Sequence, residues 1–322
     1  MSDLPKSVQI NEEGPREGFQ IEPGPIATER KIALIDALSR TGLNTIQVAS
    51  FVNPKRVPGW ADADAVVEGF TPHPGVKYTA LWLNEKGLAR ALTHRDRLHI
   101  AGSISLVASE PFVMKNQQRS WAENAQVQRN QIALFKANAI PVTKMSVMAA
   151  FGCNYAGDIS VQQVLDTVAS GFDIARDEDL RIEQLSLADT MAWATPQSIK
   201  RVVGAVRERW PDLRINLHLH DTRGLGLADA YAGLEMGVDS FDSAVAGLGG
   251  CPFAGHKGAA GNVCTEDLVF MCEEMGISTG VDLESLIQAA QLAEEVVGHP
   301  LPGSVMKGRS LKHLRERIGQ PA

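Results

Sequence analysis

The sequence has no long apolar run and few cysteines. Its apolar stretches fall far short of the roughly 20 residues that a membrane-spanning helix needs, and the N-terminus lacks the apolar core of a secretory signal. The cysteines do not have the paired spacing of zinc sites, and the basic residues are scattered in a chain of net charge −7. We therefore expect a cytoplasmic protein with reduced thiols, no nucleic-acid partner and no membrane partner. The four cysteines are Cys153, Cys251, Cys264 and Cys272.

Strand and helix patterns alternate along the 322 residues, of which 44% are hydrophobic. Eight such alternations predict an α/β fold, a closed parallel (β/α)8 barrel. A doubly wound open sheet is the alternative, but its Gly-x-Gly-x-x-Gly turn after the first strand is missing. We expect a catalytic barrel over residues 1–280 and a C-terminal helical extension over 281–322, which packs on the barrel or on a partner subunit. The predicted strands are 7–13, 44–51, 76–83, 98–106, 141–149, 184–188, 214–221 and 240–246.

Helices are predicted between these strands, and two of them begin at a threonine. Thr28 and Thr265 stand where a side chain would cap the helix. Pro196 suits the first turn of a further helix. The predicted helices are 28–41, 61–70, 84–94, 121–139, 161–176, 227–236 and 283–297, with two more that open at 196 and 265.

Two histidines stand near the end of the predicted seventh strand. His218 and His220 are two residues apart, so on a strand their side chains point to the same face. Two imidazoles on one face can occupy neighbouring positions around a metal. They can equally be inert members of a polar core layer, and the His-x-His pattern alone leaves both interpretations open.

Other polar residues gather where predicted strands stop. A parallel barrel brings its strand ends to one rim, which is where such barrels carry their active sites. A carboxylate, two histidines and an amide oxygen or water form a set that favours Mg²⁺ or Mn²⁺ over structural zinc. Each residue taken singly is more often a loop cap than a ligand. The strand-end residues are Arg16, Glu17, Gln47, Ser50, Asn84, Asp189, Cys251 and Asn262.

Three motifs resemble those of the 3-hydroxy-3-methylglutaryl-CoA (HMG-CoA) lyase family. They are the opening Gly14-Pro15-Arg16-Glu17-Gly18-Phe19-Gln20, the glycine-rich loop from Ser243 to Phe253 with Cys251, and the segment from Gly261 to Val269. The similarity runs from about Val8 to about Val297. The resemblance implies a TIM barrel, a divalent metal and Claisen-type cleavage of an acyl-CoA to acetyl-CoA and an oxo acid. It also suggests a homodimer.

The resemblance further implies roles for individual residues. Arg16 would stabilise the thioester enolate, Cys251 would exchange a proton with it, and Asp189 would support the metal or relay the hydroxyl proton. Alternatively, Arg16 pairs with Asp221 or Glu17 in a structural network, Cys251 is a packing residue, and Asp189 is a helix cap or strand-end cap. The other expected site residues are Glu17, His218, His220 and Asn262 for the metal, and Gln20, Gln47, Ser50 and Asn84 for the substrate.

The sequence departs from the family pattern at several positions of this site. Glu17 stands where these lyases usually have Asp, and Gln47 stands where they have a catalytic Glu. A neutral amide cannot act as a base. Ala192 and Trp193 would reshape the pocket, and the segment 255–260, with His256 and Lys257, lengthens the spacing before Asn262. We therefore expect altered substrate specificity.

Three functions remain open from the sequence. The first is cleavage of HMG-CoA or a related hydroxy-acyl-CoA. The second is a condensing synthase of the isopropylmalate or homocitrate type, and the third is a metal-binding homologue that has lost turnover. Lys55, Arg56 and Lys144 are candidates for contacts with the phosphates of CoA.

Overall fold

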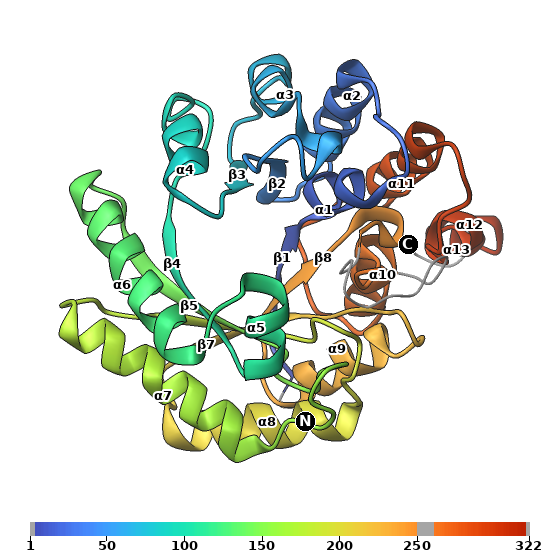
Figure 1. Ribbon diagram of the computed structural model, residues 1–322. Helices are drawn as coiled ribbons and strands as arrows, with labels where there is room; N and C mark the ends of the chain where they lie inside the picture. Colours follow the sequence, from blue (N-terminus) through green and yellow to red (C-terminus); the bar gives the residue numbers. More distant parts are fainter. Residues whose placement is uncertain (1–3, 250–260, 320–322) are drawn as a thin grey trace.

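The computed structural model describes residues 4–249 and 261–319, and it places eight parallel strands in one curled sheet with helices around it (Figure 1). The strand order is β3-β2-β1-β8-β7-β6-β5-β4, so sequential strands are neighbours and β1 lies beside β8. This arrangement confirms the predicted barrel architecture. The strands are β1 (Gln9–Glu12), β2 (Thr45–Ser50), β3 (Lys77–Leu81), β4 (Gly102–Val107), β5 (Val142–Met148), β6 (Gln184–Ala188), β7 (Arg214–His218) and β8 (Ser240–Ser243).

The sheet ladder is not continuous around the barrel. β3 and β4 are the two edges of the sheet within the described residues, where we expected a fully closed ladder. One backbone bond joins the two segments just before β4 begins, from His99 N–H to the carbonyl oxygen of Tyr78 at 2.7 Å. The strand predicted from residue 98 starts only at Gly102, because the backbone of residues 98–101 is not in the ladder.

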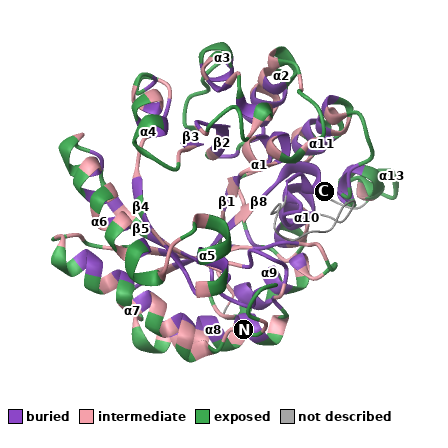
Figure 2. Cartoon of the chain, viewed as in Figure 1, coloured by how far each residue is buried: buried purple, intermediate pink, exposed green. Residues whose placement is uncertain are grey.

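The helices surround the sheet and bury one face each against it (Figure 2). They follow each strand in turn, as the sequence predicts, and α11 packs against α2 and α10. No helix in the described part of the chain is long and apolar enough to span a membrane. The helices at the predicted positions are α2 (Thr28–Leu38), α3 (Ala63–Gly69), α4 (Glu85–Leu92), α6 (Trp121–Ala137), α7 (Val161–Asp177), α8 (Pro196–Arg209), α9 (Gly226–Glu235), α10 (Thr265–Glu274) and α11 (Leu283–Val297).

Several short elements were not predicted. Helix α1 (Gly14–Ile21) starts directly after β1, and Pro15 in its first turn suits a helix start. The others are α5 (Glu110–Gln117), α12 (Val305–Gly308), α13 (Lys312–Arg317) and the 3-10 turns η1 (Pro58–Trp60) and η2 (Val245–Gly247).

The predicted caps at Thr28 and Thr265 are wrong, because both residues lie inside the first turn of their helices. The Thr28 hydroxyl donates to Asp62 at 2.7 Å, and the Thr265 hydroxyl donates to Glu12 at 2.6 Å. In both cases a partner distant in sequence has replaced the local backbone N–H that a cap would bind.

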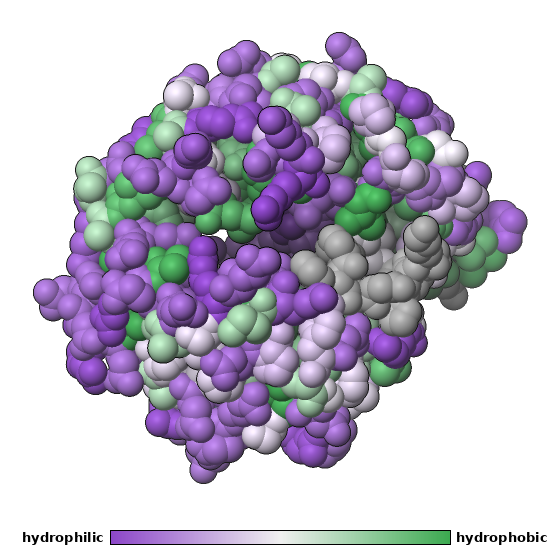
Figure 3. Space-filling model, in the orientation of Figure 1, coloured by the Kyte–Doolittle hydropathy of each residue, from purple (hydrophilic) through white to green (hydrophobic). Residues whose placement is uncertain are grey.

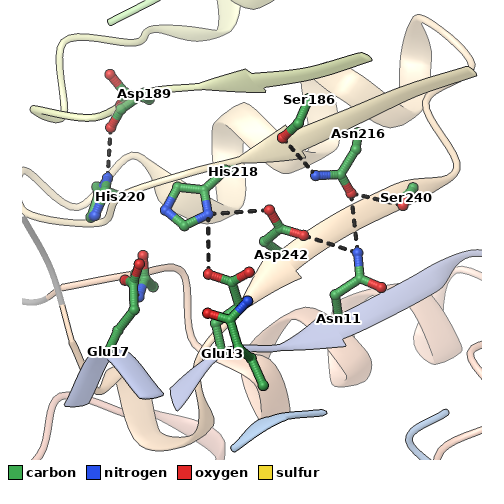
Figure 4. Close-up of polar contacts among 12 residues, drawn as sticks. Asn11, Glu13, Glu17, Ser186, Asp189, Asn216, His218, His220, Ser240 and Asp242 are labelled. Carbon is green, nitrogen blue, oxygen red and sulfur yellow. Dashed lines mark hydrogen bonds and ion pairs between the residues drawn. The ribbon is translucent and has the colours of Figure 1, made fainter. Parts of the chain in front are cut away.

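Amide and hydroxyl side chains cross-link the strands inside the barrel. Asn11 of β1 donates to Asp242 of β8 at 2.9 Å and to Asn216 of β7 at 3.3 Å. The second bond passes over β8, so these side chains lie on the inner face of the sheet. Asn216 also donates to Ser186 at 3.0 Å and accepts from Ser240 at 2.7 Å (Figure 4). This network links the inward-facing side chains of β1, β6, β7 and β8 one step before His218, toward the start of β7.

Candidate active site

The two histidines lie together at the carboxyl end of β7. Their ring centroids are 5.1 Å apart, and the ring planes meet at 69°. The seventh strand was predicted to run to residue 221, but it ends at His218. Beyond His218 the backbone no longer pairs with β8. It pairs with the segment around Asn262 instead: His220 and Asn262 form an isolated β-bridge, and Val263 N–H donates to Leu219 O at 2.9 Å. This change of backbone pairing places Asn262 beside the two histidines.

Helix α1 brings Glu17 to the same place. Donor atoms of Glu17, His218 and His220 all lie within 4.8 Å of one another. The Asn262 amide donates to Glu17 Oε2 at 2.5 Å. The four residues expected to hold a metal therefore meet, although they come from β7, from helix α1 and from two loops.

Two atoms of this group are buried without a hydrogen-bond partner. They are His220 Nε2 and Asn262 Oδ1. His220 Nδ1 donates to the carbonyl oxygen of Asp189 at 2.6 Å, which leaves Nε2 as the ring's acceptor (Figure 4). Buried acceptors are almost always satisfied, and metal-bound histidines almost always donate their other nitrogen in this way. With Glu17, these atoms fit a divalent cation.

The ionisation of the group is set by burial and by charge. Burial and the charge of His218 lower the pKa of His220 to about 4, which keeps the ring neutral. Burial also disfavours a charged His218, but the hydrogen bond to Asp242 and the charge of Glu17 raise its pKa to about 9. Arg16 and both histidines overcome the burial of Glu17 and lower its pKa to about 2.

Two carboxylates face the Nδ1 atom of His218, and neither was among the expected site residues. Nδ1 lies 3.2 Å from Asp242 Oδ2 and 3.8 Å from Glu13 Oε2 (Figure 4). Burial raises the pKa of Glu13 to about 7, against the opposing charge of Arg16. Glu13 directly follows β1, so the strand-end rule would have found it. Asp242 lies within β8, and only the folded structure shows that it faces His218.

Arg16 has a partner for each of its three nitrogens. Nη2 is 2.6 Å from Glu13 Oε2, Nη1 is 2.7 Å from Glu17 Oε1, and Nε donates to the side-chain oxygen of Gln47. The alternative pairing with Asp221 is wrong, because that carboxylate accepts from Gly226 N–H at the start of α9. The guanidinium is thus held at the metal group.

The glycine-rich loop approaches the site closely. Gly249 has a φ of +85°, and a Cβ there would lie 2.7 Å from Glu17 Cβ and 2.9 Å from the Asn262 amide nitrogen. Glycine is the residue that adopts this positive φ readily and has no Cβ to clash with Glu17 and Asn262. Cys251 of this loop, and His256 and Lys257 of the segment that follows it, lie outside the described residues.

The remaining predicted residues have mixed surroundings. Ser50 Oγ and Gln20 Oε1 are buried without a partner. Asn84 accepts from Gly87 N–H and caps α4, the ordinary structural role of such a residue. Asp189 accepts from the N–H groups of Trp193 and Ala194 through Oδ1, at 2.7 and 3.0 Å, and its Oδ2 is buried without a partner.

Asp189 is not the cap of the following helix, because the Thr195 side chain takes that role. Burial raises the pKa of Asp189 to about 6, and its bonds to Trp193 and Ala194 oppose the rise. The Trp193 ring N–H donates to Asn154 at 2.7 Å, and the ring covers Gly152. Trp193 therefore ties the loop after β6 to the loop after β5.

The candidate CoA contacts lie at opposite ends of the barrel. Lys55 and Arg56 are exposed just after the carboxyl end of β2, the end that carries Glu17. Lys144 pairs in register with Gln184 at the start of β5 and β6. Lys144 is therefore a wrong candidate, since the start of a strand is the end opposite to the site. The carboxyl end is hollowed, and hydrophilic side chains surround much of the hollow (Figure 3).

Comparisons with known proteins place the chain in a family. The HMGL-like family model matches residues 7–293. Hydroxymethylglutaryl-CoA lyase YngG of Bacillus subtilis is 41% identical over 298 residues, which cover 92% of this chain and 96% of the relative. Mitochondrial hydroxymethylglutaryl-CoA lyase of Homo sapiens is 40% identical over 294 residues, 90% of this chain and 85% of the relative.

Solved structures agree with the sequence comparisons. The crystal structure of the Bacillus subtilis HMG-CoA lyase has a TM-score of 0.86 at 39% identity and covers 96% of this chain and 99% of that one. An HMG-CoA lyase from Acinetobacter baumannii in complex with coenzyme A and 3-methylmalate has a TM-score of 0.84 at 36% identity, with 96% and 97% covered. The chain therefore belongs to the HMG-CoA lyase (HMGL-like) family and is a carbon–carbon lyase of that type.

Proposed function

We propose that this protein cleaves HMG-CoA to acetyl-CoA and acetoacetate at the group formed by Arg16, Glu17, His218, His220 and Asn262. The observation that carries the proposal is the pair of buried, unpartnered acceptors, His220 Nε2 and Asn262 Oδ1, beside the Arg16 guanidinium. Relatives about 40% identical over some 90% of the chain are HMG-CoA lyases, and one similar structure holds coenzyme A.

Glu17, His218, His220 and Asn262 would hold a divalent cation. Their oxygen and nitrogen atoms suit Mg²⁺ or Mn²⁺, as the sequence analysis expected. The cation would supply Lewis-acid chemistry that lowers the pKa of the substrate hydroxyl. The Asp189 carbonyl and the Asp242 carboxylate fix the two rings by binding their other nitrogens.

Arg16 would receive the charge that develops on the thioester oxygen. Cleavage removes the hydroxyl proton, breaks the bond between C2 and C3, and leaves an enolate on the acetyl-CoA fragment. A guanidinium already held in place donates charge-assisted hydrogen bonds to that oxygen without reorganising. Cys251 would protonate the enolate carbon, and the free Oδ2 of Asp189 is available to take the hydroxyl proton.

A second candidate function is cleavage of a related 3-hydroxy-acyl-CoA. Gln47 favours it, because its neutral amide binds Arg16 where the family pattern has a glutamate. Gln20 and Ser50, each with a buried unpartnered oxygen, are the further candidates for substrate contacts. Asn84 stays a proposal only, since its side-chain oxygen already caps α4.

A substrate panel separates these functions. Purified protein with Mn²⁺ or Mg²⁺ is given HMG-CoA and thioesters that differ at C3, and acetyl-CoA release is followed. Cleavage of HMG-CoA at the rate of an ordinary lyase contradicts altered specificity. Consumption of acetyl-CoA with a 2-oxo acid, and no release from any thioester, would favour the condensing synthase. No turnover in either direction, even after Gln47→Glu, would favour the non-catalytic homologue.

We also propose a homodimer and a catalytic unit of residues 1–280 with 281–322 as its extension. Packing of α11 on α2 and α10 supports attachment of the extension to its own barrel. Size-exclusion chromatography with light scattering tests the dimer, because it gives the mass of the particle for comparison with the 34.7 kDa of one chain.

A further inference from the structure

We propose that Glu13 is a positioning residue, which keeps the Arg16 guanidinium in place when the cation engages Glu17. The inference rests on the proposed function. It assigns a role to a carboxylate that was not among the expected site residues and that stands one residue before the motif opening at Gly14.

The charges of its hydrogen-bond partners orient Arg16. Of its three acceptors, Glu13 and Glu17 are carboxylates, whereas Gln47 is a neutral amide. Ion-paired hydrogen bonds are roughly twice as strong as neutral ones, so the two glutamates dominate the orientation of the guanidinium.

Glu17 cannot serve Arg16 alone. Its carboxylate lies among His218, His220 and Asn262, and a divalent cation there would draw on the same negative charge. Glu13 is then the one carboxylate, among the described ion-pair partners of Arg16, that lies outside the group of Glu17, His218 and His220. It faces the Nδ1 side of His218 instead, together with Asp242.

The backbone of Glu13 is held firmly enough for this task. Its N–H donates to Ser243 O of β8 at 2.8 Å, and its carbonyl accepts from Glu17 N–H at 2.9 Å in the first turn of α1. The side chain is about 15% exposed and reaches Arg16 Nη2 at 2.6 Å. Glu13 thus connects the sheet to the guanidinium.

Glu13 is not the main support of His218. Asp242 Oδ2 binds His218 Nδ1 at 3.2 Å, whereas Glu13 Oε2 lies at 3.8 Å, beyond hydrogen-bond distance. Removal of Glu13 should therefore disturb Arg16 and spare the ring. Asp242 offers a matched control, because it faces the same nitrogen and is not an ion-pair partner of Arg16 among the described contacts.

The first test measures metal affinity and needs no substrate. Mn²⁺ dissociation constants are determined by calorimetry for Glu13→Gln in the wild-type and in the Arg16→Met background. Without Glu13, Arg16 turns fully to Glu17 and competes with the cation, so the Kd rises severalfold. In the Arg16→Met background the same change moves the Kd less than twofold. Asp242→Asn should raise the Kd equally in both backgrounds.

An equal rise for Glu13→Gln in both backgrounds overturns the proposal, because Glu13 would then act on the cation or His218 directly. The same holds if Glu13→Gln leaves the wild-type Kd unchanged. These outcomes do not depend on which thioester is the substrate, so failure of the proposed function is distinguishable from failure of this inference.

The second test uses turnover of the best substrate from the panel. Glu13→Gln should lower kcat about 10- to 100-fold, the usual range for a supporting residue, with little change in KM. Adding Gln47→Glu should restore much of the loss, because the carboxylate returns on the Nε side of Arg16. Gln47→Glu alone should raise kcat by a smaller factor than it does in the Glu13→Gln background, since Glu13 already supplies a carboxylate to Arg16. No restoration in the double variant contradicts a role through Arg16.

Discussion

The two adjacent glutamates at the end of β1 have opposite surroundings. Glu12 points away from the barrel interior, is fully buried, and accepts from Gly14 N–H at 2.6 Å, Val245 N–H at 3.0 Å and the Thr265 hydroxyl at 2.6 Å. Glu13 points inward to Arg16 and His218. Alternation of faces along a strand separates the two roles.

The difference shows how one residue type can serve the fold or the site. The described partners of Glu12 are all neutral donors, one each in α1, η2 and α10, so it fastens three elements together. Burial raises its pKa to about 7, although those hydrogen bonds oppose the rise. Glu13 is surrounded by charged groups that the proposed chemistry needs. The predictions below should therefore divide between stability on the outer face and turnover on the inner face.

The largest effect is expected for Arg16→Met. Removal of a preorganised donor to a developing oxyanion costs about 10²- to 10³-fold in kcat. The change leaves the Glu12 contacts intact, so the melting temperature should stay close to that of the wild type. Steady-state kinetics and thermal unfolding check both parts. A normal kcat for Arg16→Met would contradict the proposed catalytic role of the charged residues on the inner face.

The next effect is expected for Glu12→Ala. It leaves the buried N–H groups of Gly14 and Val245 and the Thr265 hydroxyl without their acceptor, which should destabilise the protein by about 2–4 kcal/mol. Urea unfolding measures the loss, and Glu13→Ala is the matched control with a smaller loss. Equal losses for the two variants would contradict the division between the faces.

The stability effect on the outer face should depend on pH. The pKa of Glu12 rises from 4.5 to about 7 in the fold, so its contribution is present below pH 4.5 and is lost as pH rises through 7. Glu12→Gln does not titrate there. Between pH 5 and pH 8 the wild type should therefore lose roughly 2–3 kcal/mol relative to this variant. Unfolding curves at both pH values measure it, and a constant difference would contradict the raised pKa.

The smallest effects compare the two ends of the barrel. Lys55→Ala, at the carboxyl end, should raise the KM for the acyl-CoA roughly two- to fivefold, the range for one exposed ion pair. Lys144→Ala, at the start of β5, should change KM less than twofold. Burial lowers the pKa of Lys144, with help from the charges of Lys77 and Arg214 and against the charge of Asp242. The position of Lys144 in the first half of β5 is what separates it from the carboxyl end. A larger rise in KM for Lys144→Ala than for Lys55→Ala would contradict the placement of the CoA contacts at the carboxyl end of the barrel.

Much of the fold was predictable because the strands and long helices carry regular patterns. Strand 184–188 was predicted with its observed bounds, and the histidine pair was placed correctly because alternation is a local property. The predicted caps at Thr28 and Thr265 failed because Asp62 and Glu12 come from distant segments. Helix α1 was missed because it begins directly after β1, and no loop separates the two elements in the sequence.

The site was predictable by residue type but not by partner. Resemblance and strand ends together brought Glu17, His218, His220 and Asn262 into one group. Glu13 was overlooked because the motif that carries the resemblance starts one residue later, at Gly14. The hydrogen bond between Gln47 and Arg16 joins β2 to helix α1, which meet only in the folded chain, so no local rule gives it.

The central claim is that Glu17, His218, His220 and Asn262 bind one divalent cation. Pulsed electron paramagnetic resonance of the Mn²⁺-loaded protein tests it most directly, because a nitrogen bound to manganese gives a nuclear modulation signal. The account predicts a signal from two imidazole nitrogens in the wild type, from one in His220→Ala, and an unchanged signal in Glu12→Gln. Tight Mn²⁺ binding without nitrogen modulation would contradict it.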